Sequence, residues 1–472
     1  MKKEYKTLID NSILFTITNV GSKILSFILV PIYTYVLTTT EYGITDLIST
    51  TLSLLLPIVT LSIFDAVLRF AMNEKYDRTT ILSNGLVFTF FLNVIIVAVA
   101  TILSLFFLKN DFKYYIIWIA LILCFQTLYS LLSQYSRAIG KLKLFAFCGV
   151  LNTFFFLILN IVLIVIYKMG VNGYIYSMAI SFAVVTIIYS IKLHIWEVVN
   201  FKDKNTDILK LMLKYSVPLI PNSLMWWIIT SSDRYIILYY LGASINGIYA
   251  VATKIPTIIS LFNGIFFQAW QLSAIEQMES QAKDRFYSNI FKLYYLFLIL
   301  ATSGVFVVIK PIVNLLFESS YQISWIYSPL LLLAVLFQAL SSFFGAFYIA
   351  DQDTKTVFKS SCIGAVINLV GNLLLVNILG LQAVCLTTFI SFFVIFIYRC
   401  VDTKKIIKID FNLKFIIISI LIISLQVVDI IIFKFNLYVQ LFYFVCMLIV
   451  GLVENKNVIR PMISELRRKN VK

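Results

Sequence analysis

The chain has 472 residues, of which 61% are apolar and only 13% charged, and it carries a formal net charge of +15. Its mean hydropathy is +0.94. A water-soluble domain of this composition would expose more apolar surface than water tolerates, so the composition excludes a soluble enzyme or binding module. Apolar runs of about 20 residues, long enough to cross a bilayer, recur along the whole chain and predict an all-α polytopic membrane protein.

These runs predict 14 transmembrane helices. In chain order they lie at 10–37, 42–70, 80–108, 114–137, 145–167, 172–193, 212–241, 245–274, 287–310, 324–350, 357–377, 381–399, 415–433 and 437–453. Of the 38 Lys and Arg residues, 30 lie in or beside the alternate segments that include both termini, and 5 lie in or beside the others. The positive-inside rule therefore places both termini on the cytoplasmic side of the membrane. An anionic inner leaflet accounts for the basic charge, so membrane lipids and not nucleic acid are the expected partners.

The connecting segments are short. The longest lie at 194–211, 311–323 and 400–414. None is large enough to hold a catalytic domain, so we expect no enzymatic activity and no bound cofactor.

The chain also repeats itself weakly. A shift of 204 residues aligns "EYGITDLIST" (41–50) with "SINGIYAVAT" (244–253), and a shift of 210 aligns "GVNGYIYSMAIS" (170–181) with "GLQAVCLTTFIS" (380–391). Because six spans is an even number, the two copies share one orientation and are related by a pseudo-two-fold axis along the membrane normal. This predicts two six-helix lobes and two appended helices. The predicted parts are 1–200, 201–410, 411–453 and a basic cytoplasmic tail at 454–472.

Prolines gather in the first two spans of each copy. Five of the eight lie there: Pro31, Pro57, Pro218, Pro221 and Pro256. Proline removes a backbone hydrogen bond and bends a helix, which a bilayer tolerates where neighbouring groups satisfy the freed carbonyl. We therefore expect these four spans to be bent and to line a central cavity between the lobes.

The three remaining cations lie farther from the ends of the predicted spans. Lys23 and Lys254 fall near the middle of the membrane, and Arg234 is about 10 Å from a span end at 1.5 Å per residue. A buried ammonium costs at least ~2.5–3.5 kcal/mol, so each lysine must face water, a partner or a substrate. Asp46 and Asp233 lie on the same four spans. Since Asp233 and Arg234 are ~100° apart on one helix, we expect one of them to contact another span.

The candidate cavity is basic, with three cations against two carboxylates. A positive, hydroxyl-rich cavity suits an anionic polar cargo such as a phosphorylated headgroup that carries sugars. Aromatic side chains on the same spans could stack on sugar rings or simply pack in the bilayer. They are Trp226, Trp227, Tyr235, Tyr239, Tyr249 and Trp270.

Two stretches on these spans resemble a known family. "PIYTYVLTTTEYGITDL" (31–47) and "SSDRYIILYYLGASINGIYAVATKI" (231–255) are similar to signatures of the bacterial polysaccharide flippases. That family belongs to the multidrug/oligosaccharidyl-lipid/polysaccharide (MOP) exporter superfamily. The order of 14 spans, the short loops and the two-lobe repeat extend the resemblance to nearly the whole chain.

The resemblance implies a flippase for undecaprenyl-diphosphate-linked oligosaccharide repeat units of capsule, exopolysaccharide or O-antigen type, working by alternating access. The family's basic cavity residues correspond to Lys23, Lys254 and Arg234, and its seventh-span aspartate to Asp233. Relatives that flip the peptidoglycan precursor use arginines in spans 1, 2 and 8. Here spans 1 and 8 carry lysine and span 2 has only Arg69, near its inner end, which argues against that cargo. Asp46 or Asp233 could carry a coupling proton or sodium ion. Polysaccharide polymerases and glycosyltransferases are candidate partners, and the chain is expected to be a monomer.

Two other classes of protein compete with this interpretation. A cation-coupled drug antiporter of the same superfamily would need carboxylates to dominate its cavity, and here the cations dominate. A membrane-bound polymerase or glycosyltransferase would need catalytic carboxylates on a sizeable outer loop, and the predicted outer loops are short. A purely structural protein would leave Lys23 and Lys254 unexplained.

Overall fold

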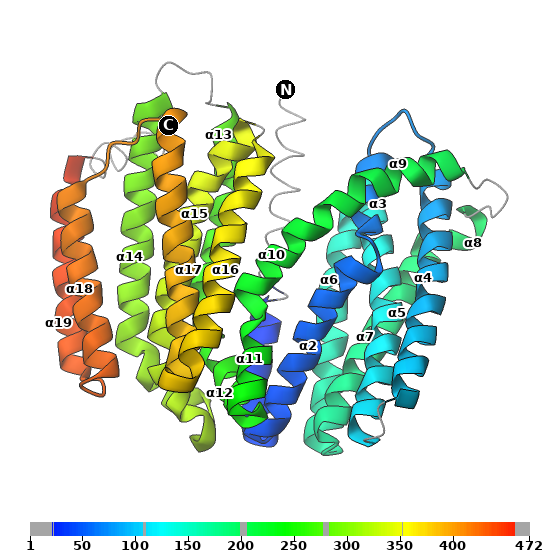
Figure 1. Ribbon diagram of the computed structural model, residues 1–472, viewed down its shortest axis with the longest axis horizontal. Coiled ribbons are helices and arrows are strands. Elements are labelled where there is room, and N and C mark those ends of the chain that lie inside the picture. Colours follow the sequence, from blue (N-terminus) through cyan, green and yellow to red (C-terminus); the bar gives the residue numbers. More distant parts are fainter. Residues whose placement is uncertain are drawn as a thin grey trace, which may run out of the picture. The chain divides into compact units, whose positions relative to one another are not determined.

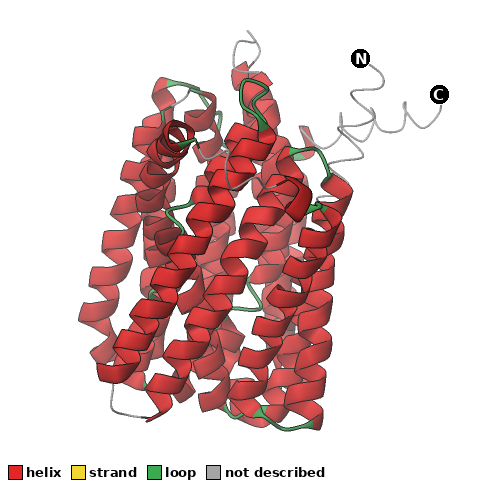
Figure 2. Ribbon diagram, turned by 90° about the vertical axis from the view of Figure 1, so that its right-hand side faces the viewer, coloured by secondary structure: helices red, strands yellow, loops and turns green. Residues whose placement is uncertain are grey.

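The computed structural model describes residues 21, 23–106, 110–198, 205–276, 283–351 and 353–457. The described residues form helices joined by short turns, and none of them lies in a strand (Figure 1). Figure 2 shows helices with loops at their ends. Residues 10–20 of the first predicted span and 458–472 of the predicted tail lie outside the described residues.

The chain forms two compact units, Met1–Trp227 and Ile228–Lys472. The predicted lobe boundaries at 200 and 410 stay a prediction, and each unit is described by itself.

The first unit begins with the apolar helix Lys23–Val36. Its other helices, in chain order, are α2 (Thr39–Val59), α3 (Ile63–Ala71), α4 (Arg78–Phe106), α5 (Asn110–Ala138), α6 (Leu142–Asn160), the π-helical η1 (Ile161–Ile166), α7 (Gly170–Lys192), α8 (Ile195–Val198), α9 (Thr206–Ser216) and the 3₁₀ turn η2 (Val217–Leu219). Helix α5 packs against α4, α3 and α7, and α6 packs against α7. The core therefore forms around α5.

Helix α10 (Ile220–Ser231) leads into the second unit. The helices that follow are α11 (Asp233–Leu241), α12 (Ala243–Ala252), α13 (Thr257–Glu276), α14 (Lys283–Leu316), η3 (Ser319–Ile326), α15 (Ser328–Ala350), α16 (Thr354–Leu379), α17 (Leu381–Asp402), η4 (Thr403–Lys405), α18 (Leu413–Ile431) and α19 (Leu437–Glu454). Helix α17 packs between α15 and α16, and α18 and α19 pack on α14. Helices α18 and α19, which the sequence predicts as two appended helices, are thus part of this unit.

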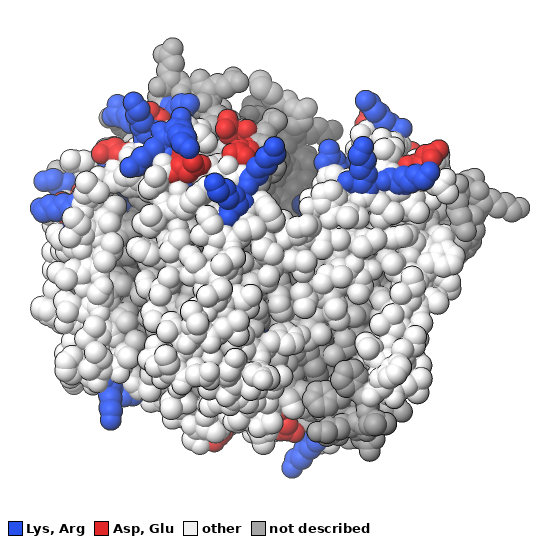
Figure 3. Space-filling model, viewed as in Figure 1, with Lys and Arg blue, Asp and Glu red and all other residues white. Residues whose placement is uncertain are grey.

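The all-α polytopic architecture is confirmed, while the number of 14 spans is not. Among the described residues, eleven helices are long and apolar enough to cross a membrane, and twelve if the bent pair α12–α13 is one span. The helix Lys23–Val36 is shorter, and the chain from 206 to 241 is divided into several pieces. On the face drawn in Figure 3, charged side chains lie at the helix ends and the band between them is uncharged. This distribution fits a multi-pass membrane protein.

Two of the predicted bends coincide with prolines. Helix α2 ends two residues after Pro57, and Leu61 and Ser62 then take left-handed φ angles of 49° and 50°. Helices α12 and α13 meet at 51° across the turn that contains Pro256. Each break leaves backbone carbonyls outside a regular helix, a feature that membrane proteins tolerate where the backbone is buried in protein or faces water.

Candidate functional site

A buried carboxylate is the centre of a polar cluster in the second unit. Asp233 is the first residue of α11, and its side chain is 0% exposed. Its Oδ1 accepts a hydrogen bond from Asn372 Nδ2 at 2.8 Å. Its Oδ2 accepts hydrogen bonds from the Tyr249 hydroxyl at 2.7 Å and the Thr388 hydroxyl at 3.0 Å. The expectation that Asp233 or Arg234 contacts another span is confirmed, because the three donors lie on α12, α16 and α17.

The cluster continues along α16 and α17. Asn372 Nδ2 also donates to Asn368 Oδ1 at 3.2 Å, and its Oδ1 accepts a hydrogen bond from the Thr387 hydroxyl. Gly371 lets the two helices come this close, since a Cβ there would lie 2.7 Å from Thr387 Cγ2. Hydrogen bonds between α16 and α17 thus continue to the Asp233 carboxylate.

The cluster combines one anionic side chain with neutral ones. Each group that donates to Asp233 is an amide or a hydroxyl, and amides and hydroxyls also carry acceptor oxygens. A carboxylate with several carbonyl and hydroxyl oxygens around it is the donor set that hard cations prefer. The arrangement can therefore hold a proton or a small hard cation, and Asp233 supplies the charge. No group of three or more His, Cys, Asp or Glu side chains that could hold a metal occurs among the described residues.

Arg234 lies at the edge of this cluster. Its side chain is half-buried, and its Nη1 donates to the Thr230 carbonyl at 3.0 Å. The guanidinium carbon lies 5.5 Å from the centre of the Tyr249 ring, whose hydroxyl donates to Asp233. Tyr249 thus contacts both charged residues, and the arginine stands close enough for a cation–π interaction.

Lys254 lies on the turn between α12 and α13 and is half-buried. Its backbone N–H donates to the Val251 carbonyl at 3.0 Å, and its own carbonyl accepts from the Thr257 N–H at 3.2 Å and from the Thr257 hydroxyl. A cation on irregular backbone within a broken span is typical of substrate sites in membrane transporters. The structure therefore places the predicted mid-membrane lysine at the break itself.

The other two predicted site residues belong to the first unit. Lys23 is exposed at the start of the described first helix, and Asp46 is half-buried on α2. One turn after Asp46, the Ser49 hydroxyl shares a hydrogen bond with the Tyr174 hydroxyl. The predicted cavity that would bring all five residues together stays a prediction.

Part of the predicted aromatic set is not available to a ligand. Trp270 is only 3% exposed and stacks on Phe343 with 4.2 Å between ring centres. Tyr249 is 2% exposed. For both side chains the sequence allowed stacking on sugar rings or packing against other helices, and the structure shows packing. In contrast, Tyr239 is 82% exposed.

One further buried cation had no specific signal in the sequence. Arg399 on α17, which the charge pattern places at an inner helix end, is only 3% exposed. Its Nε donates to the Ser360 hydroxyl at 3.0 Å and its Nη1 to the Ser341 carbonyl at 3.1 Å. It therefore joins α15, α16 and α17 by hydrogen bonds.

Sequence comparison identifies a family. Residues 8–271, more than half of the chain, match the family described as "Polysaccharide biosynthesis protein". No curated protein sequence matches the chain at a significant level.

Solved structures share the fold. The lipid II flippase MurJ in an inward closed conformation has a TM-score of 0.67 at 17% identity, over 96% of this chain and 100% of that one. An outward-facing multidrug resistance MATE transporter of the MOP superfamily has a TM-score of 0.60 at 14% identity, over 85% of this chain and 96% of that one. A MOP superfamily transporter from Pyrococcus furiosus has a TM-score of 0.60 at 12% identity, with the same coverage. At these identities the likeness shows a shared fold.

Proposed function

The chain belongs to the family of polysaccharide biosynthesis proteins, and from this premise we propose that it flips lipid-linked oligosaccharide repeat units across the bacterial cytoplasmic membrane. The cargo would be an undecaprenyl-diphosphate-linked glycan for a surface polysaccharide. The observation that carries the proposal is Lys254 on the turn between two halves of a broken span. An ionisable side chain inside a membrane span is costly and marks a substrate or ion pathway, and a lysine there suits an anionic cargo.

The cations would bind the diphosphate. Lys23 and Lys254 would hold its oxygens, with Arg234 supplementing the positive potential. A lysine ammonium is a compact point charge with three donors, whereas arginine forms a bidentate fork with phosphate. Lysine therefore releases a phosphate more readily, which a transporter needs in every cycle. The prenyl tail would stay in the lipid while the glycan crosses between the two lobes.

We propose sodium as the coupling ion and the Asp233 cluster as its site. The support is the oxygen atoms of the cluster. The Tyr249 and Thr388 hydroxyls lie 2.7 and 3.0 Å from Asp233 Oδ2. The amide oxygens of Asn368 and Asn372 and the Thr387 hydroxyl belong to the same hydrogen-bonded network. The cation would neutralise Asp233 inside the membrane and thereby lower the cost of the buried charge. Because Tyr249 contacts both Asp233 and Arg234, occupancy of the cluster would change the position of the arginine near the cargo.

A drug/cation antiporter of the same superfamily remains the alternative. The MATE structures have the same fold, and a buried carboxylate such as Asp233 would suit a cationic substrate. Lys254 and Arg234 favour the anionic cargo, because like charges would repel a cationic drug. Efflux of a cationic dye that depends on Asp233 and persists in Lys254→Ala would favour the antiporter.

The test uses cells that make their own surface polysaccharide and are depleted of this protein. We expect complete undecaprenyl-linked repeat units to accumulate on the inner leaflet. Wild type should clear them, Lys254→Ala should reduce clearance at least tenfold, and Lys254→Arg should retain part of it because the charge remains. Lys408→Ala, which removes an exposed cation from the segment between η4 and α18, is the matched control. Unchanged lipid-linked pools after depletion would contradict the proposal.

A further inference from the structure

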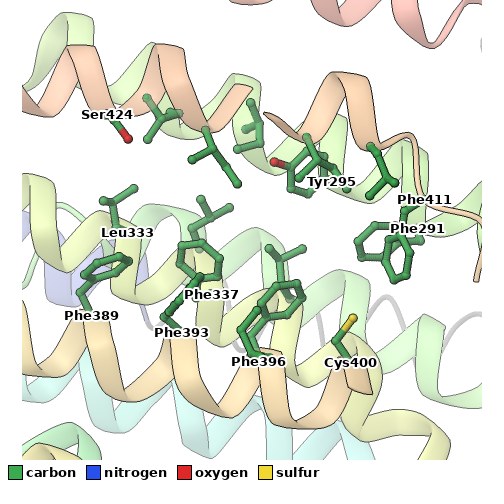
Figure 4. Close-up of a pocket in the computed structure, with 18 of the residues that line it drawn as sticks. Phe291, Tyr295, Leu333, Phe337, Phe389, Phe393, Phe396, Cys400, Phe411 and Ser424 are labelled. Atoms are coloured by element: carbon green, nitrogen blue, oxygen red, sulfur yellow. The ribbon is translucent and has the colours of Figure 1, made fainter. Parts of the chain in front are cut away.

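An apolar groove lies within the second unit and shares none of its lining residues with the Asp233 cluster. It has a volume of about 520 Å³ and lies between α14, α15, α17 and α18. Figure 4 shows Phe389, Phe393 and Phe396 in a row on one wall, with Leu333 and Phe337 beside them. Cys400 lies at one end of the labelled row and Ser424 at the other. The lining is apolar over nearly the whole length.

The length of the groove matches one leaflet of a bilayer. Along α18 its wall runs from Leu413 to Ser424, which corresponds to ~16 Å at 1.5 Å per residue. Along α17 the stretch from Phe389 to Cys400 has the same number of residues. Half of a ~30 Å hydrocarbon core is ~15 Å. The groove is therefore about as long as one leaflet of the hydrocarbon core is thick.

One end of the groove carries the exposed side chain of Lys404. Lys404 lines the groove one turn beyond Cys400 and is exposed. None of the ion pairs between described residues includes it. Three other lysines near the same helix ends are paired with carboxylates: Lys405 with Asp402 at 2.8 Å, Lys292 with Asp410 at 2.5 Å and Lys414 with Glu454 at 2.6 Å. The carboxylates in this region thus form ion pairs with these three lysines and not with Lys404.

A slender apolar chain with an anionic group at one end fits the length, the lining and the charge together.

We propose that the groove binds an anionic glycerophospholipid from the leaflet that meets Lys404. An acyl chain lies against Phe389 and Phe393, and the headgroup phosphate lies at the Lys404 ammonium. By the charge pattern of the loops, this is the cytoplasmic leaflet. A lipid in this position fills the space between α18 and the helices α15 and α17. The proposal is independent of the proposed cargo, because a bilayer lipid would bind whatever the protein transports.

The experiment uses the purified full-length protein, stripped of lipid in detergent and titrated with phosphatidylglycerol that carries a diazirine on one acyl chain. Photolabelled peptides are identified by mass spectrometry. We expect saturable labelling of the α17 and α18 segments. Lys404→Ala should weaken the apparent affinity about fivefold, the effect of one basic residue near an anionic lipid. Lys405→Ala, in the neighbouring residue paired with Asp402, should change it less than twofold.

A second variant tests the groove itself. Ser424→Trp fills the far end without changing the charge and should abolish the labelling while the protein still elutes as a folded species. Labelling outside the groove, or an equal loss in Lys404→Ala and Lys405→Ala, would overturn the proposal. Labelling by phosphatidylethanolamine with the same affinity and no effect of Lys404→Ala would also overturn it. Displacement by undecaprenyl diphosphate at a much lower concentration than by phosphatidylglycerol would instead assign the groove to a prenyl chain.

Discussion

At the scale of single residues, Arg399 shows how this fold accommodates a buried cation. The guanidinium bonds to Ser360 and Ser341, and it occupies the space that a side chain at position 345 would need. A Cβ on Gly345 would lie 2.7 Å from Arg399 Nη1. A side chain at position 345 would therefore displace this guanidinium.

Gly345→Ala should destabilise the protein by ~1–3 kcal/mol, because the buried guanidinium must move and lose hydrogen bonds. Gly264→Ala is the matched control, since a Cβ on this helical glycine has no neighbour within 4 Å and alanine favours a helix by ~0.5–1 kcal/mol. Thermal unfolding in detergent measures both. In a Gly345→Ala/Arg399→Lys double variant the two effects should not add. Additive effects would show that the arginine is not what excludes the side chain.

Sodium binding at the Asp233 cluster can be tested separately from cargo binding. Sodium, compared with potassium at constant ionic strength, should raise the unfolding temperature of the wild type by about 2–3 °C. Asp233→Asn and Thr388→Val should abolish this shift and reduce transport at least tenfold. Thr388→Ser, which keeps the hydroxyl, should retain both. Lys254→Ala should keep the sodium shift but lose transport, because it removes only the cargo contact. Equal stabilisation of the wild type by both ions would rule out sodium at this site.

At the scale of helices, α4 begins with a carboxylate cap. Asp77 precedes the first residue of α4 and accepts hydrogen bonds from the Thr80 N–H at 2.8 Å, the Thr80 hydroxyl at 2.9 Å and the Thr79 hydroxyl. The Thr79 hydroxyl and the Thr80 N–H are the main causes that hold the pKa of Asp77 below its ordinary value of 3.8. A depressed pKa means that the ionised cap stabilises the folded state at pH values above 3.8 and that this contribution is lost as the pH falls further.

Asp77→Ala should therefore lower the free energy of unfolding by ~0.5–1 kcal/mol at pH 7. The difference from the wild type should shrink as the pH falls below about 4. Asp77→Asn keeps an acceptor oxygen but does not titrate. Its stability relative to Asp77→Ala should stay constant between pH 7 and pH 3. A wild-type advantage that is unchanged at pH 3 would show that the charge of Asp77 contributes nothing.

Helix positions were predictable from the sequence, and several helix breaks were not. The ends of α4, α7 and α19 lie within two residues of the predicted spans, since a long apolar run has few alternatives to a helix in a bilayer. The break at Pro256 was predictable because proline marks it. The break between α10 and α11 at Ser232 has no proline, and the π-helical end of α6 has none either. These depend on contacts with other helices.

The candidate site was likewise predictable only in part from the sequence. Asp233 was recognisable from its depth in an apolar stretch. Its partners were not, because Asn372 and Thr388 lie 139 and 155 residues away in the chain. Trp270 was ambiguous for a related reason: an aromatic side chain in a membrane helix packs inward or faces a cavity according to which face the neighbours cover. Pairwise contacts between distant spans are set by tertiary packing, which hydropathy and charge do not encode.

At the scale of the whole molecule, the charge distribution predicts the orientation in the membrane. Lys75, between α3 and α4, belongs to a predicted inside segment, and Lys168, before α7, belongs to a predicted outside one; both are exposed. In intact cells, a membrane-impermeant maleimide should label Lys168→Cys at least tenfold more strongly than Lys75→Cys. After permeabilisation the two should label equally, which controls for expression and folding. The parent protein, whose six cysteines are buried or half-buried, sets the background. The opposite labelling pattern would place both termini outside, and Lys404 with its proposed lipid would then belong to the outer leaflet.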